Sequence, residues 1–179
     1  MKATSFSTIL ARIDAAEYGI CRRLNRGASN NGLRALFRVA SRLGDGVIWY
    51  CMMAVLPLLY SGRAARPVVI MAITGVLGVA LYKALKRVFV RERPFITHSS
   101  ISLAMAPLDR YSFPSGHTLH AVSFTWQAVA YFPELAWVLV PLASLIAASR
   151  VVLGLHYPTD VLAGAAIGSA LALLGLSFA

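Results

Sequence analysis

The sequence predicts an all-α integral membrane protein, a bundle of about five transmembrane helices preceded by an N-terminal amphipathic helical segment. Of its 179 residues, 58% are hydrophobic and 13% are charged, and the mean hydropathy of +0.68 exceeds that of ordinary soluble domains. Five apolar stretches approach the roughly 20 residues that a helix needs to cross a bilayer. Because no internal repeat or linker divides the chain, we expect an amphipathic, interfacial segment at 1–44 and a single membrane-embedded domain at 45–179.

The segment 1–44 is rich in basic side chains, among which apolar residues such as Phe6, Ile9, Leu10 and Leu36 are spaced. This pattern is typical of one or two helices that lie on a membrane surface. A solvated helical face that packs on the rest of the protein explains it equally well. Eight of the 17 basic residues fall here: Lys2, Arg12, Arg22, Arg23, Arg26, Arg34, Arg38 and Arg42.

The first two predicted spans are joined by the short polar stretch "SGRAARP". The first covers about 46–61, and we expect its cysteine, Cys51, to be a buried structural thiol. The second covers about 67–88, where Gly75 and Gly78 allow close contact with a neighbouring helix.

The other three spans are predicted at about 115–132, 134–152 and 158–178. Pro133 separates the third from the fourth, and Pro158 suits the first turn of the fifth, where its missing N–H costs nothing. The fifth is dense in small residues, which favours tight packing against other helices over lipid exposure.

Five successive crossings bring four helix ends to one membrane face, and most polar side chains of the predicted spans lie at those ends. Ionisable residues at membrane depth are costly and usually functional, so this convergence indicates a site. The opposite face carries only Arg63, Arg66 and Glu134. The polar face carries Lys86, Arg93, Ser115, His117, His120, Arg150, His156 and Asp160.

Three cations of this set, Lys86, Arg93 and Arg150, favour an anion, and a phosphate group fits the arginine fork and the lysine point charge. The stretch "PSGH" at 114–117 adds backbone amides at a helix start. Gly116 lets the main chain approach a ligand closely, and Ser115 supplies a hydroxyl and a helix cap. We expect no nucleic-acid partner, because the basic residues lack interleaved stacking aromatics.

The histidines suggest chemistry beyond binding. His156 precedes Asp160 by four residues, so the carboxylate can fix the imidazole tautomer and free the other ring nitrogen as a nucleophile. His117, from another helix, is then available as the general acid for the leaving oxygen. The cations would stabilise the charge of an in-line phosphoryl transfer.

Three motifs resemble those of the type-2 phosphatidic acid phosphatase superfamily, which includes the vanadium-dependent haloperoxidases. "KRVFVRERP" matches the pattern Lys, six residues, Arg-Pro, through Lys86 and Arg93, and "PSGH" is the second motif. "SRVVLGLHYPTD" matches the third, Ser-Arg, five residues, His, three residues, Asp, through Arg150, His156 and Asp160. The resemblance covers about residues 45–178.

The resemblance implies a metal-independent lipid phosphatase without a cofactor, acting through a phosphohistidine intermediate on a membrane lipid in the bilayer. It implies that His156 attacks phosphorus, that Asp160 supports it and that His117 protonates the leaving group. Implied substrates are undecaprenyl diphosphate, phosphatidic acid or phosphatidylglycerol phosphate. The phosphate would be held by Lys86, Arg93, Ser115, Gly116 and Arg150.

Two alternatives stay open beside hydrolysis: a lipid phosphotransferase that uses the same site, and a membrane transporter, which would carry polar residues near the middle of its spans. We expect a multi-pass protein of the bacterial inner membrane. The positive-inside rule places the site in the cytoplasm, whereas the resemblance favours the outer face. The sequence indicates no oligomeric state.

Residues near the motifs are candidates for further roles. His120 lies one helical turn beyond His117, so His120 is a candidate for lining the cavity, as is Tyr157 beside His156. Taken singly, Arg87 and Arg91 are expected to be interfacial anchors that extend toward lipid headgroups. The loop at 96–110 is expected to shape substrate access.

Overall fold

The computed structural model describes residues 2–178, and for residues 2–7 and 9–11 it describes the backbone alone. All regular structure in this part of the chain is helical, as predicted. Five helices lie where the five spans are expected, with ends within about two residues of the predicted ends. They are α3 (Val47–Tyr60), α4 (Ala65–Phe89), α6 (Gly116–Tyr131), α7 (Ala136–Val152) and α8 (Pro158–Leu176).

Three stretches of the described chain have the length and apolar composition to cross a membrane: Val47–Thr97, Pro133–Val152 and Pro158–Leu176. The first contains α3 and α4, joined by the 3-10 helix η2 (Ser61–Ala64), and the short helix α5 (Pro94–Thr97). Helix α6 has 16 residues, about 24 Å at 1.5 Å per residue, and packs against α4, α7 and α8. The protein is an integral membrane protein built on a helical bundle.

Local sequence sets the two helix starts that matter most for the site. Ser115 is the N-cap of α6 and its side chain accepts a hydrogen bond from the Thr118 amide at 3.5 Å. Pro158 occupies the first turn of α8, and the Asp160 carboxylate accepts the Tyr157 amide at 2.8 Å, which caps that helix. Helix α8 therefore begins at the predicted residue, and α6 begins one residue after the predicted start, with Ser115 as the predicted cap.

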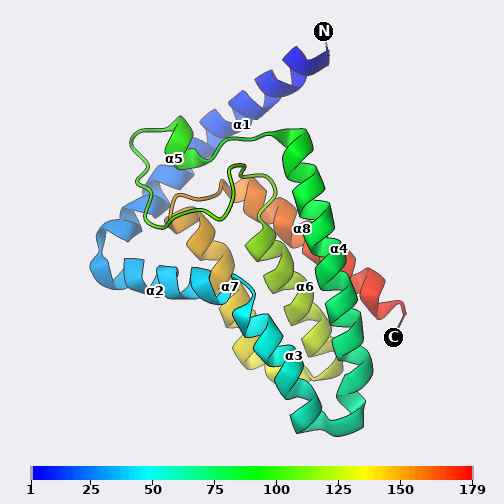
Figure 1. Ribbon diagram of the computed structural model, residues 1–179. Helices are drawn as coiled ribbons and strands as arrows, with labels where there is room; N and C mark the ends of the chain where they lie inside the picture. Colours follow the sequence, from blue (N-terminus) through cyan, green and yellow to red (C-terminus); the bar gives the residue numbers. More distant parts are fainter. Residues whose placement is uncertain (1, 179) are drawn as a thin grey trace.

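Small residues allow α6 to contact α8 and α4 at backbone distance. A Cβ atom added to Gly168 of α8 would lie 2.4 Å from the carbonyl oxygen of Leu119, which no real structure tolerates. On α4, a Cβ at Gly75 would lie 2.9 Å from the ring of Phe124, and one at Gly78 equally close to the Leu119 side chain. The close contacts predicted for α4 and α8 are confirmed, and they make α6 the centre of the bundle (Figure 1).

Helices α3 and α4 meet at η2 and diverge toward the opposite end of the bundle (Figure 1). Near η2 they close over an apolar core that contains Leu56, Ala64 and Met71. Further along α3, the Trp49 ring lies 5.6 Å from the ring of Phe124 on α6. The diverging ends leave room beside α6 for the cavity described below.

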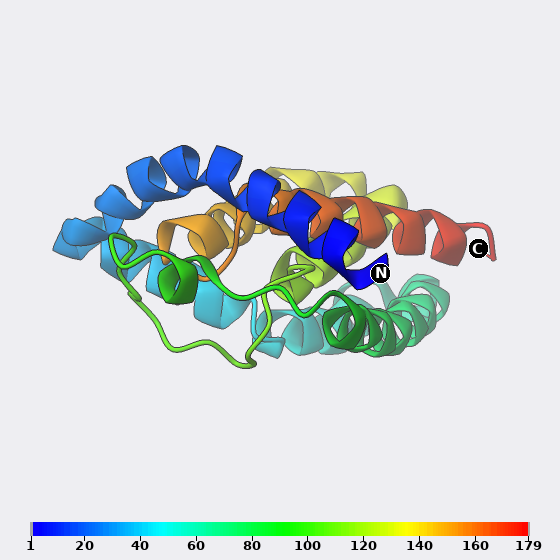
Figure 2. The ribbon, with the colours of Figure 1, turned by 90° about the horizontal axis from the view of Figure 1, so that it is seen from above.

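The N-terminal segment forms two helices, α1 (Lys2–Asn25) and α2 (Asn31–Leu43), linked by the 3-10 helix η1 (Arg26–Ser29). Helix α1 crosses the end of the bundle where α4 ends (Figures 1 and 2). Helix α2 packs on α7 and leaves Leu36 and Val39 exposed. One face of α2 thus packs on the protein while another remains apolar and uncovered, which combines features of both sequence interpretations. The side chains of Lys2, Phe6, Ile9 and Leu10 lie outside the described residues.

The expectation that Cys51 is buried is wrong, because its side chain is exposed on α3. Trp49 faces the core, and two residues further along a helix the side chain has turned by about 200° to the opposite side. The buried cysteine is Cys21 of α1 instead.

Candidate active site

A cavity of about 460 Å³ lies where the polar ends of the helices meet. Its wall is formed by α3, α4, α6 and α7, by the turn between α2 and α3, and by the loops that follow α4, α5 and α7. Seven residues singled out from the sequence line it: Lys86, Arg93, Gly116, His117, His120, Arg150 and His156.

The three cations of the motifs come together although they are far apart in the chain. Lys86 lies in the last turn of α4, Arg93 lies four residues after the end of that helix, and Arg150 lies in the last turn of α7. All three are buried and line the same cavity. Arg150 is 2% exposed, donates through Nη1 to the Ser41 hydroxyl, and has no partner for its Nε among the described residues. A buried guanidinium with a free donor in a cavity is suited to an anion.

The proton position on His156 follows from its neighbour. Arg93 Nη1 lies 3.2 Å from His156 Nε2, and a guanidinium can only donate, so Nε2 must carry the lone pair. The remaining proton is on Nδ1, which lies 3.5 Å from Asp160 Oδ2. Burial, together with the positive charges of Arg93 and Arg150, holds the pKa of His156 well below 6.5. The imidazole is therefore neutral at neutral pH, with its nucleophilic nitrogen turned to the cations.

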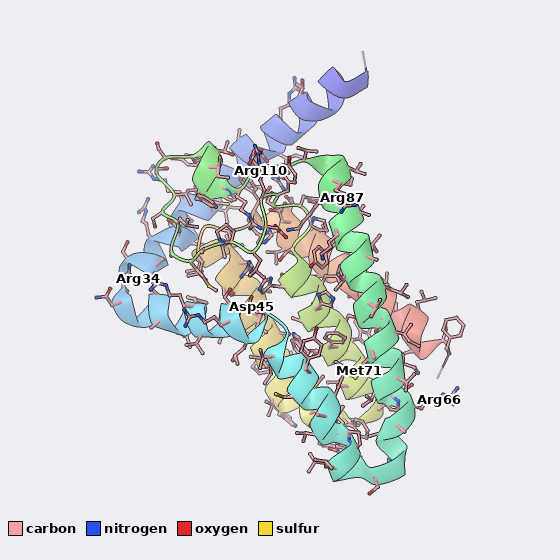
Figure 3. The ribbon with its side chains drawn as sticks, viewed as in Figure 1. Arg34, Asp45, Arg66, Met71, Arg87 and Arg110 are labelled. Atoms are coloured by element: carbon pink, nitrogen blue, oxygen red, sulfur yellow. The ribbon has the colours of Figure 1, made fainter. Side chains whose placement is uncertain are left out.

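Arg91 corrects a prediction. It is not an interfacial anchor, because it is 3% exposed and lies at the centre of a buried carboxylate cluster. It donates to Asp160 Oδ1 at 2.6 Å, to Glu17 Oε2 at 2.8 Å and through Nε to Asp14 Oδ1 at 2.9 Å. Arg91 is not one of the motif residues, so its spacing did not indicate a role. Its partners come from α1 and α8, which are distant in sequence. Arg87, in contrast, is exposed on α4, as expected of an anchor (Figure 3).

Three predicted site residues do not line the cavity: Asp160, which lies beside His156, and also Tyr157 and Ser115. Tyr157 is 0% exposed, packs with Cys21 and Ile101, and carries the Arg91 guanidinium 4.1 Å above its ring. The prediction that Tyr157 lines the cavity is wrong, because the first turn of α8 directs it toward α1. Burial raises the pKa of its hydroxyl to about 12.

Ser115 is also fully buried, and the structure does not bring its hydroxyl to the cavity. Its Oγ lies 3.0 Å from Thr118 Oγ1, while its amide donates to the carbonyl oxygen of Asp160 at 3.0 Å. Ser115 thereby joins the start of α6 to the start of α8. This link brings the helix that carries His117 next to the helix that carries Asp160.

His117 has a partner that the sequence did not indicate. Its Nε2 lies 2.5 Å from Oδ1 of Asp45, which sits in the turn between α2 and α3 (Figure 3). Gly44 allows this approach, because a Cβ there would lie 2.9 Å from Ile146 and 3.0 Å from the His117 ring. Gly46 adopts a φ of +123°, which favours glycine. A Gly-Asp-Gly stretch reads as an ordinary turn, so the only available signal was its position just before the first span.

Asp109 is the second carboxylate that sequence reasoning missed. Lys86 Nζ donates to both of its oxygens, at 2.7 and 2.9 Å, and Arg93 Nη2 donates to Oδ1 at 2.6 Å. Burial opposes ionisation of Asp109, but the hydrogen bonds and charges of Lys86 and Arg93 outweigh it and lower the pKa below its ordinary value of 3.8. Asp109 belongs to an irregular loop, where no periodic pattern marks a residue's direction.

His120 lines the cavity and links two helices. Its Nδ1 lies 3.0 Å from the carbonyl oxygen of Gly116, one turn back on α6, and its Nε2 lies 3.2 Å from that of Gly75 on α4. The Tyr82 ring meets the imidazole edge-on at 5.9 Å between ring centres. These contacts hold the position of α4 beside the start of α6.

The part of the cavity away from the charges is apolar. Helix α3 contributes two aromatic side chains and a methionine, and α4 contributes a methionine and two valines. A cavity with a cationic end and an apolar end suits an amphiphile with an anionic headgroup. The apolar part is lined by Trp49, Tyr50, Met53, Met71, Val76 and Val79.

Comparison with known proteins agrees with this geometry. The profile of the PAP2 superfamily matches residues 63–179. The undecaprenyl-diphosphatase of Sulfolobus acidocaldarius is 31% identical over 154 residues, which cover 85% of this chain and 72% of that protein. The decaprenylphosphoryl-5-phosphoribose phosphatase of Mycobacterium tuberculosis is 32% identical over 142 residues, 77% of this chain and 76% of that protein.

The fold has a solved counterpart. The crystal structure of Aquifex aeolicus LpxE superposes with a TM-score of 0.73 at 25% sequence identity, and the match covers 90% of this chain and 95% of LpxE.

Proposed function

This chain belongs to the PAP2 superfamily of metal-independent lipid phosphatases, and from that premise we propose that it removes phosphate from a polyprenyl diphosphate through a phosphohistidine intermediate. The observation that carries the proposal is one cavity. It is lined by the cations Lys86, Arg93 and Arg150, by His117 and His156, and by apolar side chains. The proposed setting is the inner membrane of a bacterium.

In the first half of the reaction, His156 Nε2 attacks the terminal phosphorus and forms an N–P bond while the P–O bond to the leaving group breaks. Its lone pair already faces the cations, and Asp160 stabilises the positive charge that develops on the ring. His117 gives a proton to the leaving oxygen. Arg93 and Arg150 offset the charge on the equatorial phosphate oxygens.

In the second half, a water molecule replaces the lipid product. His117, now neutral, takes a proton from that water, which attacks phosphorus and breaks the N–P bond. Inorganic phosphate leaves and His156 returns to its neutral state. Asp45, 2.5 Å from His117 Nε2, is positioned to stabilise the imidazolium form of His117 before the first half and after the second.

A polyprenyl diphosphate is preferred over phosphatidic acid and phosphatidylglycerol phosphate for two reasons. The cavity of about 460 Å³ must also hold the headgroup, so the space beside side chains such as Trp49 and Met53 suits part of one isoprenoid chain better than the paired acyl chains of a glycerolipid. A similar protein that spans most of this chain is named an undecaprenyl-diphosphatase. A panel of the three lipids, assayed for phosphate release by the purified protein, tests the order.

Replacement of His156 by Ala tests the mechanism. We expect this variant to release no phosphate from undecaprenyl diphosphate, while the wild-type protein works equally well with and without a chelator. Full activity in His156→Ala would contradict the nucleophile assignment.

The two alternatives make different predictions. A phosphotransferase would release no phosphate from a labelled lipid until an acceptor lipid is added, whereas hydrolysis needs only water. A transporter would carry polar groups near the middle of its spans, but here the cationic groups gather at one end of the bundle. Family membership favours the enzyme.

A further inference from the structure

The cations assigned to phosphate already hold an anion that belongs to the protein. Asp109 receives two hydrogen bonds from Lys86 and one from Arg93. Its side chain is 40% exposed and lines the cavity, whereas those of Lys86 and Arg93 are almost fully buried. The carboxylate therefore lies between the cations and the open part of the cavity.

A count of donors shows that Lys86 cannot bind phosphate while this contact lasts. An ammonium group has three N–H donors. Two go to the carboxylate of Asp109 and the third goes to the carbonyl oxygen of Tyr111 at 2.8 Å. Arg93 is engaged similarly, with the carbonyl oxygen of Leu155 at 2.7 Å and with Asp109.

The segment that carries Asp109 is held by side chains rather than by regular structure, since Arg93 Nε donates to the carbonyl oxygens of Asp109 and Arg110 at 3.1 and 3.2 Å. Its two ends are fixed, because the Ala104 amide donates to the Leu153 carbonyl at 3.2 Å and the Ser112 amide donates to the Arg91 carbonyl at 2.8 Å. Between them, in the described structure, the backbone of residues 105–111 makes no hydrogen bond to other main-chain atoms. Displacing the carboxylate thus breaks side-chain contacts and no regular structure.

We propose that Asp109 is a specificity-determining residue, an internal competitor that a terminal phosphate displaces and the phosphate of a phosphodiester lipid does not. A terminal phosphate carries a charge of about −1.5 to −2 and three free oxygens. It exceeds one carboxylate in charge and has an oxygen to spare for the free donor of Arg150. A phosphodiester carries one negative charge and two free oxygens, so it gains nothing over Asp109.

This selection has a purpose in a bilayer, where phosphodiester lipids far outnumber any lipid with a terminal phosphate. A cationic cavity open to lipid would otherwise be filled by bulk headgroups. The inference rests on the proposed function, since it assumes that phosphate binds at Lys86 and Arg93.

The test measures binding of inorganic phosphate to the purified protein in a phosphate-free detergent by calorimetry. Removing one negative charge beside the anion should tighten phosphate binding about tenfold in Asp109→Asn. Asp109→Ala should tighten it as well, and Asp109→Glu should stay near wild type. Glu92→Gln is the matched control, because Glu92 pairs with the exposed Arg110 next to Asp109, and its loss should leave the affinity within twofold.

A second arm measures competition. Phosphatidylglycerol added to the micelles should inhibit hydrolysis by Asp109→Asn at least tenfold more strongly than hydrolysis by the wild type. Equal inhibition of the two proteins would overturn the proposal. Weaker phosphate binding in both Asp109→Asn and Asp109→Ala would also overturn it, because Asp109 would then serve to hold the cations in place.

One further variant separates this proposal from the proposed function. Arg93→Ala should weaken phosphate binding. If phosphate binds equally to wild type and to Arg93→Ala, the anion does not bind in this cavity, and the proposed function fails with it. If Arg93→Ala weakens binding while Asp109→Asn does not tighten it, only the competition by Asp109 is refuted.

Discussion

The chemistry of the cavity depends on which nitrogen of His156 carries the proton. Because Arg93 can only donate, it selects the tautomer with a lone pair on Nε2, and Asp160 lies on the Nδ1 side. The two neighbours agree on one tautomer. Arg93 therefore prepares His156 for nucleophilic attack as much as Asp160 does.

The dependence of kcat/KM on pH tests this description of His156. An imidazole must be neutral to attack, and the pKa of His156 lies well below 6.5 because of burial and the charge of Arg93. As the pH falls through 6.5, kcat/KM should therefore persist, and it should fall only at more acid pH. In Arg93→Ala the lost positive charge should raise the pKa of His156, so the acid limb should move to higher pH even though the rate is lower.

Arg110→Ala is the control for the profile, because Arg110 is exposed and pairs only with Glu92 among the described residues. Its acid limb should coincide with that of the wild type. Any pKa of the substrate itself cancels in this comparison, since all three proteins receive the same lipid. An acid limb that stays in place in Arg93→Ala would contradict the assignment to His156.

Arg91 makes the second prediction at this scale. Arg91→Ala leaves Asp14, Glu17 and Asp160 without their shared partner, and breaking a buried ion pair costs about 3–5 kcal/mol of stability. Arg91→Lys keeps the positive charge, so the variant should fold. It loses the planar guanidinium that donates to several carboxylates at once, so kcat should fall with little change in KM. Thermal unfolding and steady-state kinetics measure both effects.

Arg87→Ala provides the matched control, four residues away on the exposed side of α4 (Figure 3). It removes one basic charge near the same helix end and should change neither stability nor kcat. If Arg91→Lys behaves like Arg87→Ala, Arg91 does not position Asp160.

At the level of helices, the sequence predicted the features that depend on apolar runs and on the residues that begin or end a helix. The five spans, the proline at the start of α8 and the cap of α6 are local features, so they could be read directly. Asp45 and Asp109 could not, because turns and loops carry no period that fixes the direction of a side chain. Arg91 was misassigned because its environment comes from α1 and α8, which lie 74 and 69 residues away in sequence.

The contact between α6 and α8 provides a prediction about packing. Gly168→Ala places a methyl group 2.4 Å from the Leu119 carbonyl oxygen, so the helices must separate. Overpacking of this kind costs about 1–3 kcal/mol, and we expect a lower melting temperature in detergent together with lower activity. Activity should fall because α6 carries His117 and α8 carries Asp160.

The control is Gly19→Ala on α1, where no atom lies within 4 Å of the added Cβ. Alanine is the better helix former, so this variant should be as stable as the wild type or slightly more so. Equal melting temperatures for Gly168→Ala and the wild type would show that α8 can move away from α6 without loss.

At the scale of the whole molecule, charge is concentrated where helix ends, a loop and α1 meet, and the remaining surface of the bundle is largely apolar. The arrangement lets a lipid keep its chain in the bilayer while its headgroup reaches the cations. It also makes the N-terminal segment part of the site's support, because α1 lies across the same end (Figure 2).

The last prediction follows from that position of α1. Glu17 accepts the Thr159 amide at 2.6 Å and the Arg91 guanidinium at 2.8 Å, so one carboxylate of α1 fixes both the start of α8 and the partner of Asp160. In the double variant Asp14→Asn, Glu17→Gln, Asp160 is the one carboxylate among the described residues that still pairs with Arg91, and Arg91 draws it away from His156. We expect kcat to fall about tenfold, because the positive charge that develops on His156 loses the carboxylate 3.5 Å from Nδ1, and we expect KM to change less than twofold. Glu134→Gln, at the opposite end of the bundle beside Tyr60, should leave kcat unchanged. A double variant with normal kcat, or one whose KM rises while kcat holds, would mean that α1 does not support the catalytic aspartate.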